Sequence, residues 1–220
     1  MIDNKNLQTI RILGISGSPN PHTDGTAFFV KEALNAAAEI PGIVTEMVSL
    51  DEYLIEPCDA CDTCKRYYEK KGTRRYYCKK KDDVVDLVYR FVAADGHIIG
   101  SPVYFFERPG KMKDFMDRFY CIYHLPWQIN DHSVGGAIAV GDTPNSGQEI
   151  VLDAISTFYA GWGVLIYNGS AGIGVSINNG ELGVEGAIRD TESIAKVRTL
   201  GRELAEATII SLLGTRRTAR

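Results

Sequence analysis

The sequence predicts an α/β protein built on a doubly wound parallel sheet of five strands, and two observations lead to this prediction. Short runs of apolar and β-branched residues alternate with segments whose apolar residues recur at helical period, as in successive βαβ units. The length of 220 residues and the hydrophobic content of 45% suffice for one domain with a sizeable core. We therefore expect residues 1–220 to form a single domain.

The expected strands are the short apolar runs, and glycines bound the third and fourth of them. In chain order the strands are Thr9–Ile15, Ile43–Leu50, Gly96–Gly100, Val134–Val140 and Val164–Tyr167. Five parallel strands in this order fit the flavodoxin-like arrangement. In that arrangement the ligand lies beyond the carboxyl ends of the strands, at the point where the strand order reverses.

The expected helices are the amphipathic segments between these strands. In chain order the helices are Thr26–Glu39, Asp82–Ala94, Lys111–Cys121, Gln148–Tyr159 and Thr191–Leu213. The stretch 51–81, after the second strand, is a long insert that contains most of the cysteines. The glycine-rich stretch 169–186 is expected to be an ordered loop or a mobile flap.

The insert carries a cysteine pattern that favours a metal cluster. Cys58, Cys61 and Cys64 follow one another at a spacing of three, and Cys78 follows after thirteen other residues. A triple at this spacing can wrap one face of a [4Fe-4S] cluster, with a fourth cysteine closing the site. Zinc and free thiols are the alternatives, although structural zinc sites more often use two separated pairs. Cys121 is most simply a small buried hydrophobic residue.

The first strand leads through a loop rich in serine, proline and glycine directly into a helix, which predicts a phosphate site. The candidate phosphate-binding residues of this loop are Ser16, Ser18, Pro19, Asn20, Thr23, Gly25 and Thr26. The loop matches neither G-x-x-x-x-G-K-[ST] nor G-x-G-x-x-G, so we expect neither an ATP or GTP site nor an NAD site of the Rossmann type. The alternative is an ordinary turn followed by a helix cap.

Two further loops follow the third and fourth strands and are expected to reach the same crevice. The first can flank a planar heterocycle with Pro102, Val103, Tyr104 and Phe105, or it can pack these residues into the core. The second, Gly141–Gly147, contributes Thr143 and Gly147 as candidate binding residues, and its glycines permit close approach of the backbone.

The net charge of −4 conceals a strong asymmetry. Between Lys65 and Lys81 nine basic residues stand against one acidic residue, so this segment is +8 and the remainder of the chain is −12. The segment is either a solvated loop or a surface that attracts an acidic partner. Its tyrosines alternate with basic residues, but no nucleic-acid-binding module surrounds them, so nucleic acid is not expected.

The sequence also favours a cytoplasmic location. Residues 1–8 lack the pattern of a signal peptide, and no apolar run approaches the ~20 residues that a membrane span needs. In a reducing compartment, clustered cysteines are more often metal ligands or redox groups than disulfides. The four histidines are scattered and form no hydrolytic arrangement, and His97, in an apolar run, is expected in the core.

Taken together, these residues resemble the NADPH-dependent FMN reductase branch of the flavodoxin superfamily, and specifically the iron-sulfur flavoproteins. The resembling motifs are Gly17-Ser18-Pro19 with Gly25-Thr26, the cysteine triple, Asp82-Asp83 at a helix start, and Ser101-Pro-Val-Tyr104 followed by Lys113-x3-Asp117-Arg118. The resemblance runs from about Ile10 to Val140. It implies that the FMN phosphate lies at the first loop and the isoalloxazine against residues 102–105.

The resemblance further implies an FMN-dependent oxidoreductase that is a homo-oligomer, either a dimer or a tetramer. Electrons would pass between FMN, a [4Fe-4S] cluster and a small redox protein such as ferredoxin. The gap of thirteen residues before Cys78 departs from the family, where the fourth cysteine follows the third closely. The alternative is an NAD(P)H-dependent reductase of flavins or quinones whose cysteine loop binds zinc or is only structural. A nucleotide-binding structural domain is a third reading.

Overall fold

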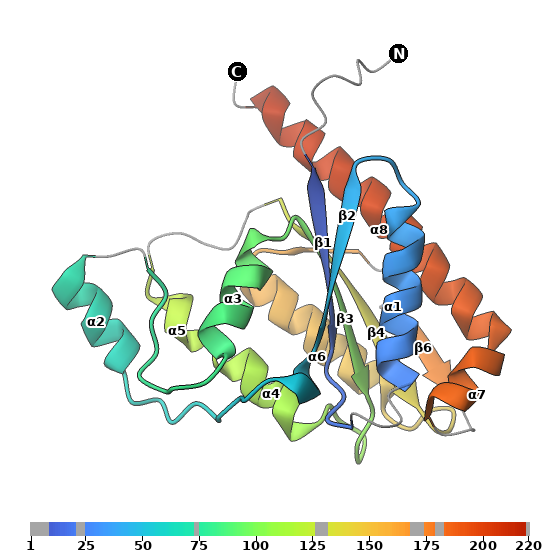
Figure 1. The fold of residues 1–220 in the computed structure, drawn as a ribbon, viewed down its shortest axis with the longest axis horizontal. Helices are drawn as coiled ribbons and strands as arrows, with labels where there is room; N and C mark the ends of the chain where they lie inside the picture. Colours follow the sequence, from blue (N-terminus) through green and yellow to red (C-terminus); the bar gives the residue numbers. More distant parts are fainter. Residues whose placement is uncertain are drawn as a thin grey trace.

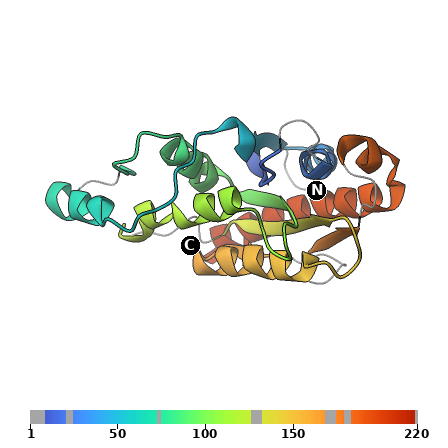
Figure 2. The same cartoon turned by 90° about the horizontal axis from the view of Figure 1, so that it is seen from below.

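The computed structural model describes residues 9–20, 25–72, 75–125, 132–167, 174–178 and 183–218. Its centre is a parallel sheet with the strand order β2-β1-β3-β4-β5, in which β6 also pairs with β4. Helices cover both faces of this sheet (Figures 1 and 2). The predicted doubly wound α/β arrangement is therefore confirmed.

All strand pairings in the described sheet are parallel. The strands are β1 Ile10–Ser16, β2 Ile43–Ser49, β3 Gly96–Pro102, β4 Val134–Gly141, β5 Leu165–Ile166 and β6 Val175–Asn178. The first four lie where the sequence predicts them, within two residues at each end.

Two short strands share the fifth position of the sheet. β5 pairs with Val134 and Gly135 at the start of β4, whereas β6 pairs with Ile138–Gly141 at its end. The strand predicted at 164–167 is thus correctly placed, but it pairs only with the first residues of β4. The prediction of a loop or flap is wrong for β6, because this strand lies within the glycine-rich stretch.

Two helices were not expected from the sequence, namely α2 inside the insert and α7. The helices are α1 Gly25–Ala38, α2 Thr63–Lys71, α3 Val84–Ala93, α4 Gly110–Asp117, α5 Tyr120–Tyr123, α6 Gln148–Gly161, α7 Gly183–Arg189 and α8 Thr191–Thr218, with a 3-10 turn at Leu50–Glu52. The single helix expected at 111–121 is divided into α4 and α5. Within the described ranges, no helix is both long and apolar enough to cross a membrane.

The sheet separates two hydrophobic clusters, because successive side chains of a strand point to opposite faces. Ile12 of β1 belongs to the cluster with α1 and α8, which includes Phe29 and Leu204. The next residue, Leu13, belongs to the cluster with α3, α4 and α6, which includes Phe115. Both faces of β1 are therefore buried, as parallel sheets require.

The insert begins and ends at a clasp of hydrogen bonds. The Leu54 N–H donates to the Asp83 carboxylate at 2.7 Å, and the Asp83 N–H donates to the Leu54 carbonyl at 3.0 Å. Two residues further into the insert, the Glu56 N–H donates to the Asp82 carboxylate at 3.0 Å. The two stems of the insert therefore lie side by side at the start of α3, where the sequence predicts that Asp82 and Asp83 open a helix.

His97 of β3 lies in the core, as predicted. Its side chain is fully buried and stacks on Phe91 with ring centroids 3.9 Å apart, and its Nε2 lies 2.9 Å from the Phe91 carbonyl oxygen. Burial lowers the pKa of His97 from 6.5 to about 4. Between pH 4 and pH 6.5 the imidazole of His97 is therefore neutral in the folded protein and protonated in the unfolded chain.

The stability of the fold should therefore depend on pH through His97. The pKa of His97 is lower in the folded state than in the unfolded state. The folded state is therefore fully stable with respect to this group above pH 6.5, and it loses stability as the pH falls toward 4, because the unfolded chain binds the proton. His97→Phe keeps a stacked ring but removes the titration. We expect the stability difference between parent and variant to change by about 3 kcal/mol between pH 7 and pH 4, measured by urea unfolding. A constant difference would contradict this account.

Candidate functional site

Three loops follow the carboxyl ends of β1, β3 and β4, at the lower edge of the sheet in Figure 1. Because these neighbouring strands are parallel, their carboxyl ends meet along one edge. The strand order reverses between β1 and β3, since β2 lies on one side of β1 and β3 on the other. Ligands of doubly wound sheets bind at this point.

The first loop buries its hydroxyl groups. Ser16, Ser18 and Thr26 are at most 4% exposed. The Ser18 N–H donates to the Ser16 hydroxyl at 3.3 Å, and the Asn20 N–H donates to the Ser18 hydroxyl at 3.2 Å. Backbone groups and hydroxyls thus hold the loop in a tight curve ahead of α1. Thr23 lies outside the described residues.

The loop packs closely against its neighbours at Gly17. A Cβ atom on Gly17 would lie 2.7 Å from the sulfur of Met112, and the Gly17 N–H donates to the Gly100 carbonyl at 2.7 Å. The loop is therefore pressed against β3 and α4. α1 begins at Gly25, and its first turn carries Thr26, so N–H groups at a helix start lie beside the buried hydroxyls.

The second loop turns its aromatic residues toward solvent. Tyr104 and Glu107 exchange two backbone hydrogen bonds of 2.7 and 3.1 Å, which close a tight turn around Phe105 and Phe106. Both phenylalanines have positive φ angles, 48° and 68°, and are 99% and 62% exposed. The Val103 N–H donates to the Val140 carbonyl at 2.8 Å and fixes the loop to β4. These aromatic residues therefore do not pack into the core.

The third loop contacts the second through Gly147. This residue has a φ of 109°, and a Cβ atom on it would lie 2.5 Å from Cα of Phe106. The side-chain amide of Gln148 donates to the Thr143 carbonyl at 2.8 Å, and its oxygen accepts from the Ser146 N–H at 2.9 Å. Gln148 is fully buried and shapes this loop, a role that the sequence analysis missed.

The cysteine triple lies at the start of α2. Ala60 and Asp62 adopt left-handed backbone conformations, which curl the chain between the cysteines. All five cysteines have free thiols; Cys64 is buried, and Cys58, Cys61 and Cys78 are half-buried. Hydrogen bonds from Thr63 lower the pKa of Cys61, whereas burial raises the pKa of Cys64.

Cys121 is buried, as predicted, but it is not isolated. Burial raises its pKa to about 12, and the nearby thiols of Cys78, Cys64 and Cys58 act in the same direction. The five cysteines of the chain therefore gather in one region. A donor set of thiols suits iron-sulfur clusters or zinc. Within the described ranges, however, no three Cys, His, Asp or Glu side chains converge closely enough to hold a metal ion.

Tyrosines attach the insert to the body of the protein. The Tyr68 hydroxyl donates to the Cys121 carbonyl at 2.5 Å and accepts from the Tyr77 N–H at 2.9 Å. Tyr67 and Tyr77 stack with ring centroids 4.0 Å apart. The Tyr120 hydroxyl donates to the Asp62 carboxylate at 2.6 Å, beside the cysteine triple. The tyrosines between the basic residues are thus largely structural.

Part of the basic charge of the insert is paired internally. Lys79 and Lys80 form ion pairs of 3.2 and 3.3 Å with Asp59 and Glu56, which tie the return segment of the insert to its outgoing segment. Hydrogen bonds with Cys61 and Lys79 lower the pKa of Asp59 to about 2. The remaining positive charge lies mainly on the exposed surface of α2, at Lys65, Arg66, Lys70 and Lys71.

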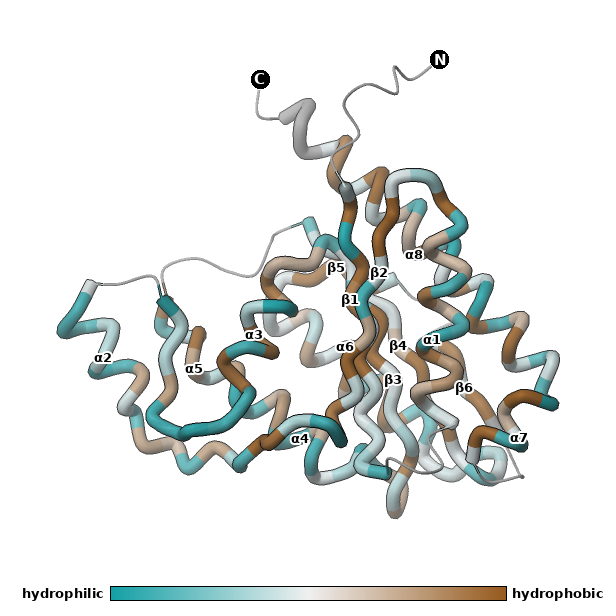
Figure 3. The backbone as a smooth tube through the Cα atoms, viewed as in Figure 1, coloured by the Kyte–Doolittle hydropathy of each residue, from teal (hydrophilic) through white to brown (hydrophobic). Residues whose placement is uncertain are grey.

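The two candidate regions lie apart in one chain. α2 is largely hydrophilic and lies at one end of the molecule, while the three loops lie at the lower edge of the sheet in Figure 1 (Figures 1 and 3). The three binding loops and the cysteines near α2 therefore form two separate candidate sites.

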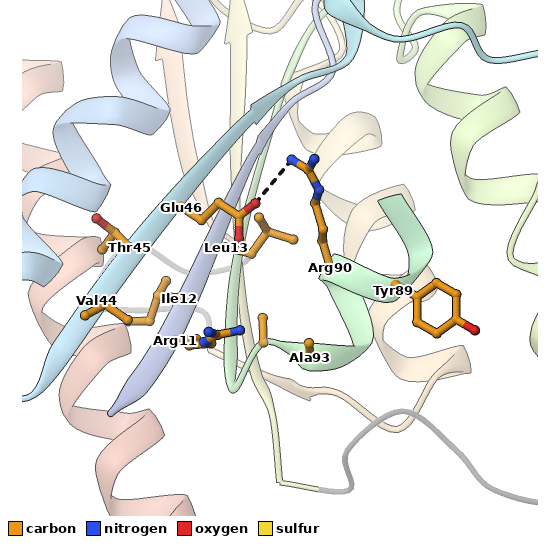
Figure 4. A pocket seen from close by; sticks show the side chains of 10 residues that line it. Arg11, Ile12, Leu13, Val44, Thr45, Glu46, Tyr89, Arg90 and Ala93 are labelled. Carbon is orange, nitrogen blue, oxygen red and sulfur yellow. Dashed lines mark hydrogen bonds and ion pairs between the residues drawn. The ribbon is translucent and has the colours of Figure 1, made fainter. Parts of the chain in front are cut away.

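A cavity of about 440 Å³ lies elsewhere, between α3 and the first halves of β1 and β2 (Figure 4). The Arg90–Glu46 ion pair of 3.2 Å crosses it, and Leu13 forms part of its wall. Because Arg11 and Val44 also line it, near the starts of their strands, this cavity is at the opposite end of the strands from the three loops. It is not the crevice predicted from the sequence.

The three loops lie at the switch point of the sheet, and the first of them buries its hydroxyl groups. Comparison with known proteins identifies the family that has this arrangement. The sequence profile of the family described as NADPH-dependent FMN reductase matches residues 10–176. The chain belongs to this family. The resemblance noted in the sequence is therefore confirmed, and the match extends beyond Val140. Members of the family are FMN-dependent oxidoreductases, and this chain is one.

Relatives of this reductase family include proteins of known name and structure. An iron-sulfur flavoprotein of Methanocaldococcus jannaschii is 40% identical over 150 residues, which cover 68% of this chain and 72% of that protein. The structure of RosB with the bound intermediate 8-demethyl-8-formylriboflavin-5'-phosphate superimposes with a TM-score of 0.69 at 16% identity, covering 96% of this chain and 86% of RosB. A WrbA-like flavodoxin of Agrobacterium tumefaciens gives 0.61 at 13% identity, covering 92% and 99%. The two structures show the fold, which is flavodoxin-like.

Proposed function

We propose that this FMN-dependent oxidoreductase carries a [4Fe-4S] cluster on its cysteine insert and passes electrons between FMN, the cluster and a redox partner. The observation that carries the proposal is that one chain contains two separate candidate sites. One is the set of loops at the switch point with buried hydroxyls, and the other is a region of thiols. The name of the Methanocaldococcus jannaschii relative, an iron-sulfur flavoprotein, supports it.

In this proposal the first loop binds the FMN phosphate. Hydroxyls of Ser16, Ser18 and Thr26 donate hydrogen bonds, and the N–H groups at the start of α1 add a favourable dipole. The aromatic turn of the second loop, with Pro102 and Val103 at its base, lies against the isoalloxazine, and the third loop with Thr143 and Gly147 closes the same crevice. Backbone groups of these loops can then orient the ring and exclude water from one edge.

The cysteine insert would hold the cluster with Cys58, Cys61, Cys64 and Cys78. FMN supplies two-electron or one-electron chemistry and an iron-sulfur cluster supplies one-electron chemistry, so the pair can convert one mode into the other. The loop that curls at Ala60 and Asp62 presents three thiols from one turn. Rotation of the side chains is needed, because the thiols do not converge in the structure.

A homo-oligomer, either a dimer or a tetramer, is part of the proposal. In one chain α2 and the cysteines near it lie to the left of the sheet in Figure 1, away from the three loops at its lower edge. A second copy can place its insert next to the loops of the first, which shortens the path for electrons. An acidic small redox protein such as ferredoxin is the proposed partner, attracted by the exposed basic residues of α2.

The experiment that tests the function is the composition of protein purified without oxygen. We expect a brown protein with FMN and with about four iron and about four acid-labile sulfide per chain. The second candidate function is an NAD(P)H-dependent reductase of flavins or quinones with a zinc-binding or purely structural cysteine loop, and the separation of the thiols favours the purely structural form. Stoichiometric zinc without sulfide would decide for this second function.

The phosphate loop can be tested on the apoprotein. Ser18→Ala and Thr26→Ala should each raise the FMN dissociation constant roughly tenfold or more, because hydrogen bonds to a charged group contribute about 1.5–3 kcal/mol. Titration of flavin fluorescence measures the effect. Thr199→Ala, the same change on an exposed face of α8, is the control and should leave the constant unchanged. If both loop variants bind FMN as tightly as the parent, the phosphate lies elsewhere.

A further inference from the structure

A fully buried glutamine joins three parts of the molecule beyond the end of β4. The side-chain Nε2 of Gln148, the first residue of α6, donates to the Thr143 carbonyl of the third loop at 2.8 Å and to the Ile177 carbonyl of β6 at 3.5 Å. Its Oε1 accepts from the Ser146 N–H at 2.9 Å and from the Ser146 hydroxyl at 3.2 Å. Both ends of the amide are therefore used, and Gln148 is 0% exposed.

These bonds turn one carbonyl of the third loop inward. The Thr143 carbonyl accepts a second hydrogen bond, from the Ser146 hydroxyl at 2.8 Å, and Asn145 between them has a left-handed backbone with a φ of 56°. Within the described ranges, the N–H groups of Thr143 and Asn145 donate to no protein atom, and both residues are exposed. The loop thus satisfies its carbonyl internally and leaves N–H donors for a ligand or for water.

The third loop also supports the second loop, which carries donors of the same kind. A Cβ atom on Gly147 would lie 2.5 Å from Cα of Phe106, so the two backbones touch. In the turn that Tyr104 and Glu107 close, the N–H groups of Phe105 and Phe106 donate to no described residue. Two loops in direct contact therefore offer unused backbone donors. Such donors suit a ligand edge rich in acceptors, such as the carbonyl oxygens and ring nitrogens of an isoalloxazine.

The order of the strands separates these donors from the phosphate loop. β3 lies between β1 and β4, and neighbouring strands are about 4.8 Å apart, so the first and third loops begin about 10 Å from each other. A ligand that reaches both loops is therefore elongated, and each loop contacts a different end of it.

We propose that Gln148 is a positioning residue for the flavin ring. It holds the third loop, and through Gly147 the second, so that their unused N–H groups face the acceptor edge of the isoalloxazine. Gln148 itself touches neither the ring nor the phosphate. The inference rests on the FMN site of the proposed function. The competing account is a glutamine that only stabilises the start of α6, and the two accounts differ in the effect that they predict on flavin ligands with and without a phosphate.

Two substitutions separate these accounts. Gln148→Met keeps the approximate volume of the side chain and removes its hydrogen bonds. Gln148→Glu keeps the shape, and its neutral carboxyl can still donate to the Thr143 carbonyl and accept from the Ser146 N–H, whereas its ionised form has no donor. Burial raises the pKa of a carboxyl, so the neutral form is present at mildly acid pH and is lost as the pH rises. Thr208→Val is the matched control, because Thr208 is also 0% exposed and its hydroxyl donates to the Leu204 carbonyl at 2.8 Å, within α8.

The measurement is the affinity of the full-length apoprotein for FMN and for riboflavin, which has the same ring without the phosphate, by titration of flavin fluorescence. In Gln148→Met we expect the dissociation constants of both ligands to rise by the same factor, about tenfold, because hydrogen bonds to the ring are lost and those to the phosphate are kept. Ser18→Ala should raise only the constant for FMN, and Thr208→Val should change neither. In Gln148→Glu, riboflavin should bind nearly as in the parent at about pH 5.5 and about tenfold more weakly at about pH 8. Thermal unfolding of each variant shows whether it is folded.

A folded Gln148→Met variant that binds riboflavin as tightly as the parent would overturn the inference, and so would one that loses affinity for FMN alone. If Gln148→Met does not fold, the two pH values decide. An affinity of Gln148→Glu for riboflavin that does not change with pH, relative to the parent, would then refute the role of the amide. A parent apoprotein that binds neither flavin would refute the proposed FMN site instead, and that result is known before any variant is made.

Discussion

Replacement of Cys58 with alanine is expected to abolish iron binding and to leave FMN binding intact. The proposed cluster needs all four of its cysteine ligands, whereas the flavin loops lie at the ends of β1, β3 and β4, apart from the insert (Figure 1). Iron, acid-labile sulfide and FMN would be measured per chain in protein purified without oxygen. The ratio of FMN to protein should not change, while iron and sulfide should fall to background.

Cys121→Ala provides the matched control for this experiment. Cys121 is buried among the other cysteines but is not one of the four proposed ligands. Its removal should therefore leave iron and sulfide at the level of the parent. If Cys121→Ala loses iron and Cys78→Ala does not, the fourth ligand has been assigned to the wrong cysteine.

Reversal of charge on α2 is expected to slow electron exchange with an acidic partner by about tenfold at low salt. Lys70 and Lys71 are exposed in the last turn of this helix, at the end of the molecule that carries the cysteines. Their replacement with glutamate would turn attraction into repulsion, and long-range charge acts mainly on the association rate. Stopped-flow mixing with reduced ferredoxin at several ionic strengths measures the effect. At high salt the difference should largely disappear, because screening limits exposed charges to ~10 Å at 0.1 M.

The control is an equal change of charge on the opposite side of the sheet. Lys31 of α1 and Lys196 of α8 are exposed, and their replacement with glutamate changes the net charge by the same amount. This variant should exchange electrons almost as fast as the parent. Equal slowing in both variants would mean that net charge, and not the insert, determines the rate. Unchanged rates in both would leave α2 a purely structural element.

The sequence was sufficient to predict the regular part of the fold. β1, β3 and β4 were located because each is a largely buried run of apolar and small residues, and β2, an edge strand with only Ile43 and Val48 buried, because it is a short run rich in apolar and β-branched residues. The long helices were located because their apolar faces recur at helical period. β6 was missed because a strand of four residues, Val175-Ser-Ile-Asn178, lies in a stretch whose glycines dominate the pattern. α2 was missed because its pattern is largely charged, and only Cys64 and Tyr68 on it are buried.

The site was predicted in part, for a related reason. Hydroxyl residues after β1 predict a phosphate loop from local sequence alone, whereas the burial of Ser16, Ser18 and Thr26 is seen only in the structure. The bond between Asp82 and Arg118 joins residues 36 positions apart, and each was noted only as part of a separate motif. The role of Gln148 in shaping the third loop could not be predicted, because the sequence shows only that this residue follows Gly147 at the start of a helix. The outward turn of Phe105 and Phe106 depends on left-handed backbone conformations that no local pattern of phenylalanine predicts.

The clasp at the base of the insert makes the cysteine region a removable module. Since Leu54 and Asp83 are joined by hydrogen bonds of 2.7 and 3.0 Å, the chain leaves the flavodoxin-like body and returns to it at nearly the same place. A short turn can therefore span the gap left by residues 55–82, provided that Arg118, then without Asp82, is replaced by an uncharged residue and that the core surface covered by Cys64 and Tyr68 is made polar. The reverse change is also possible: the insert with its two stems could be grafted onto the loop after the second strand of a flavodoxin that has no insert. Gain or loss of the proposed cluster site in such folds would then need one insertion or deletion and no change to the sheet.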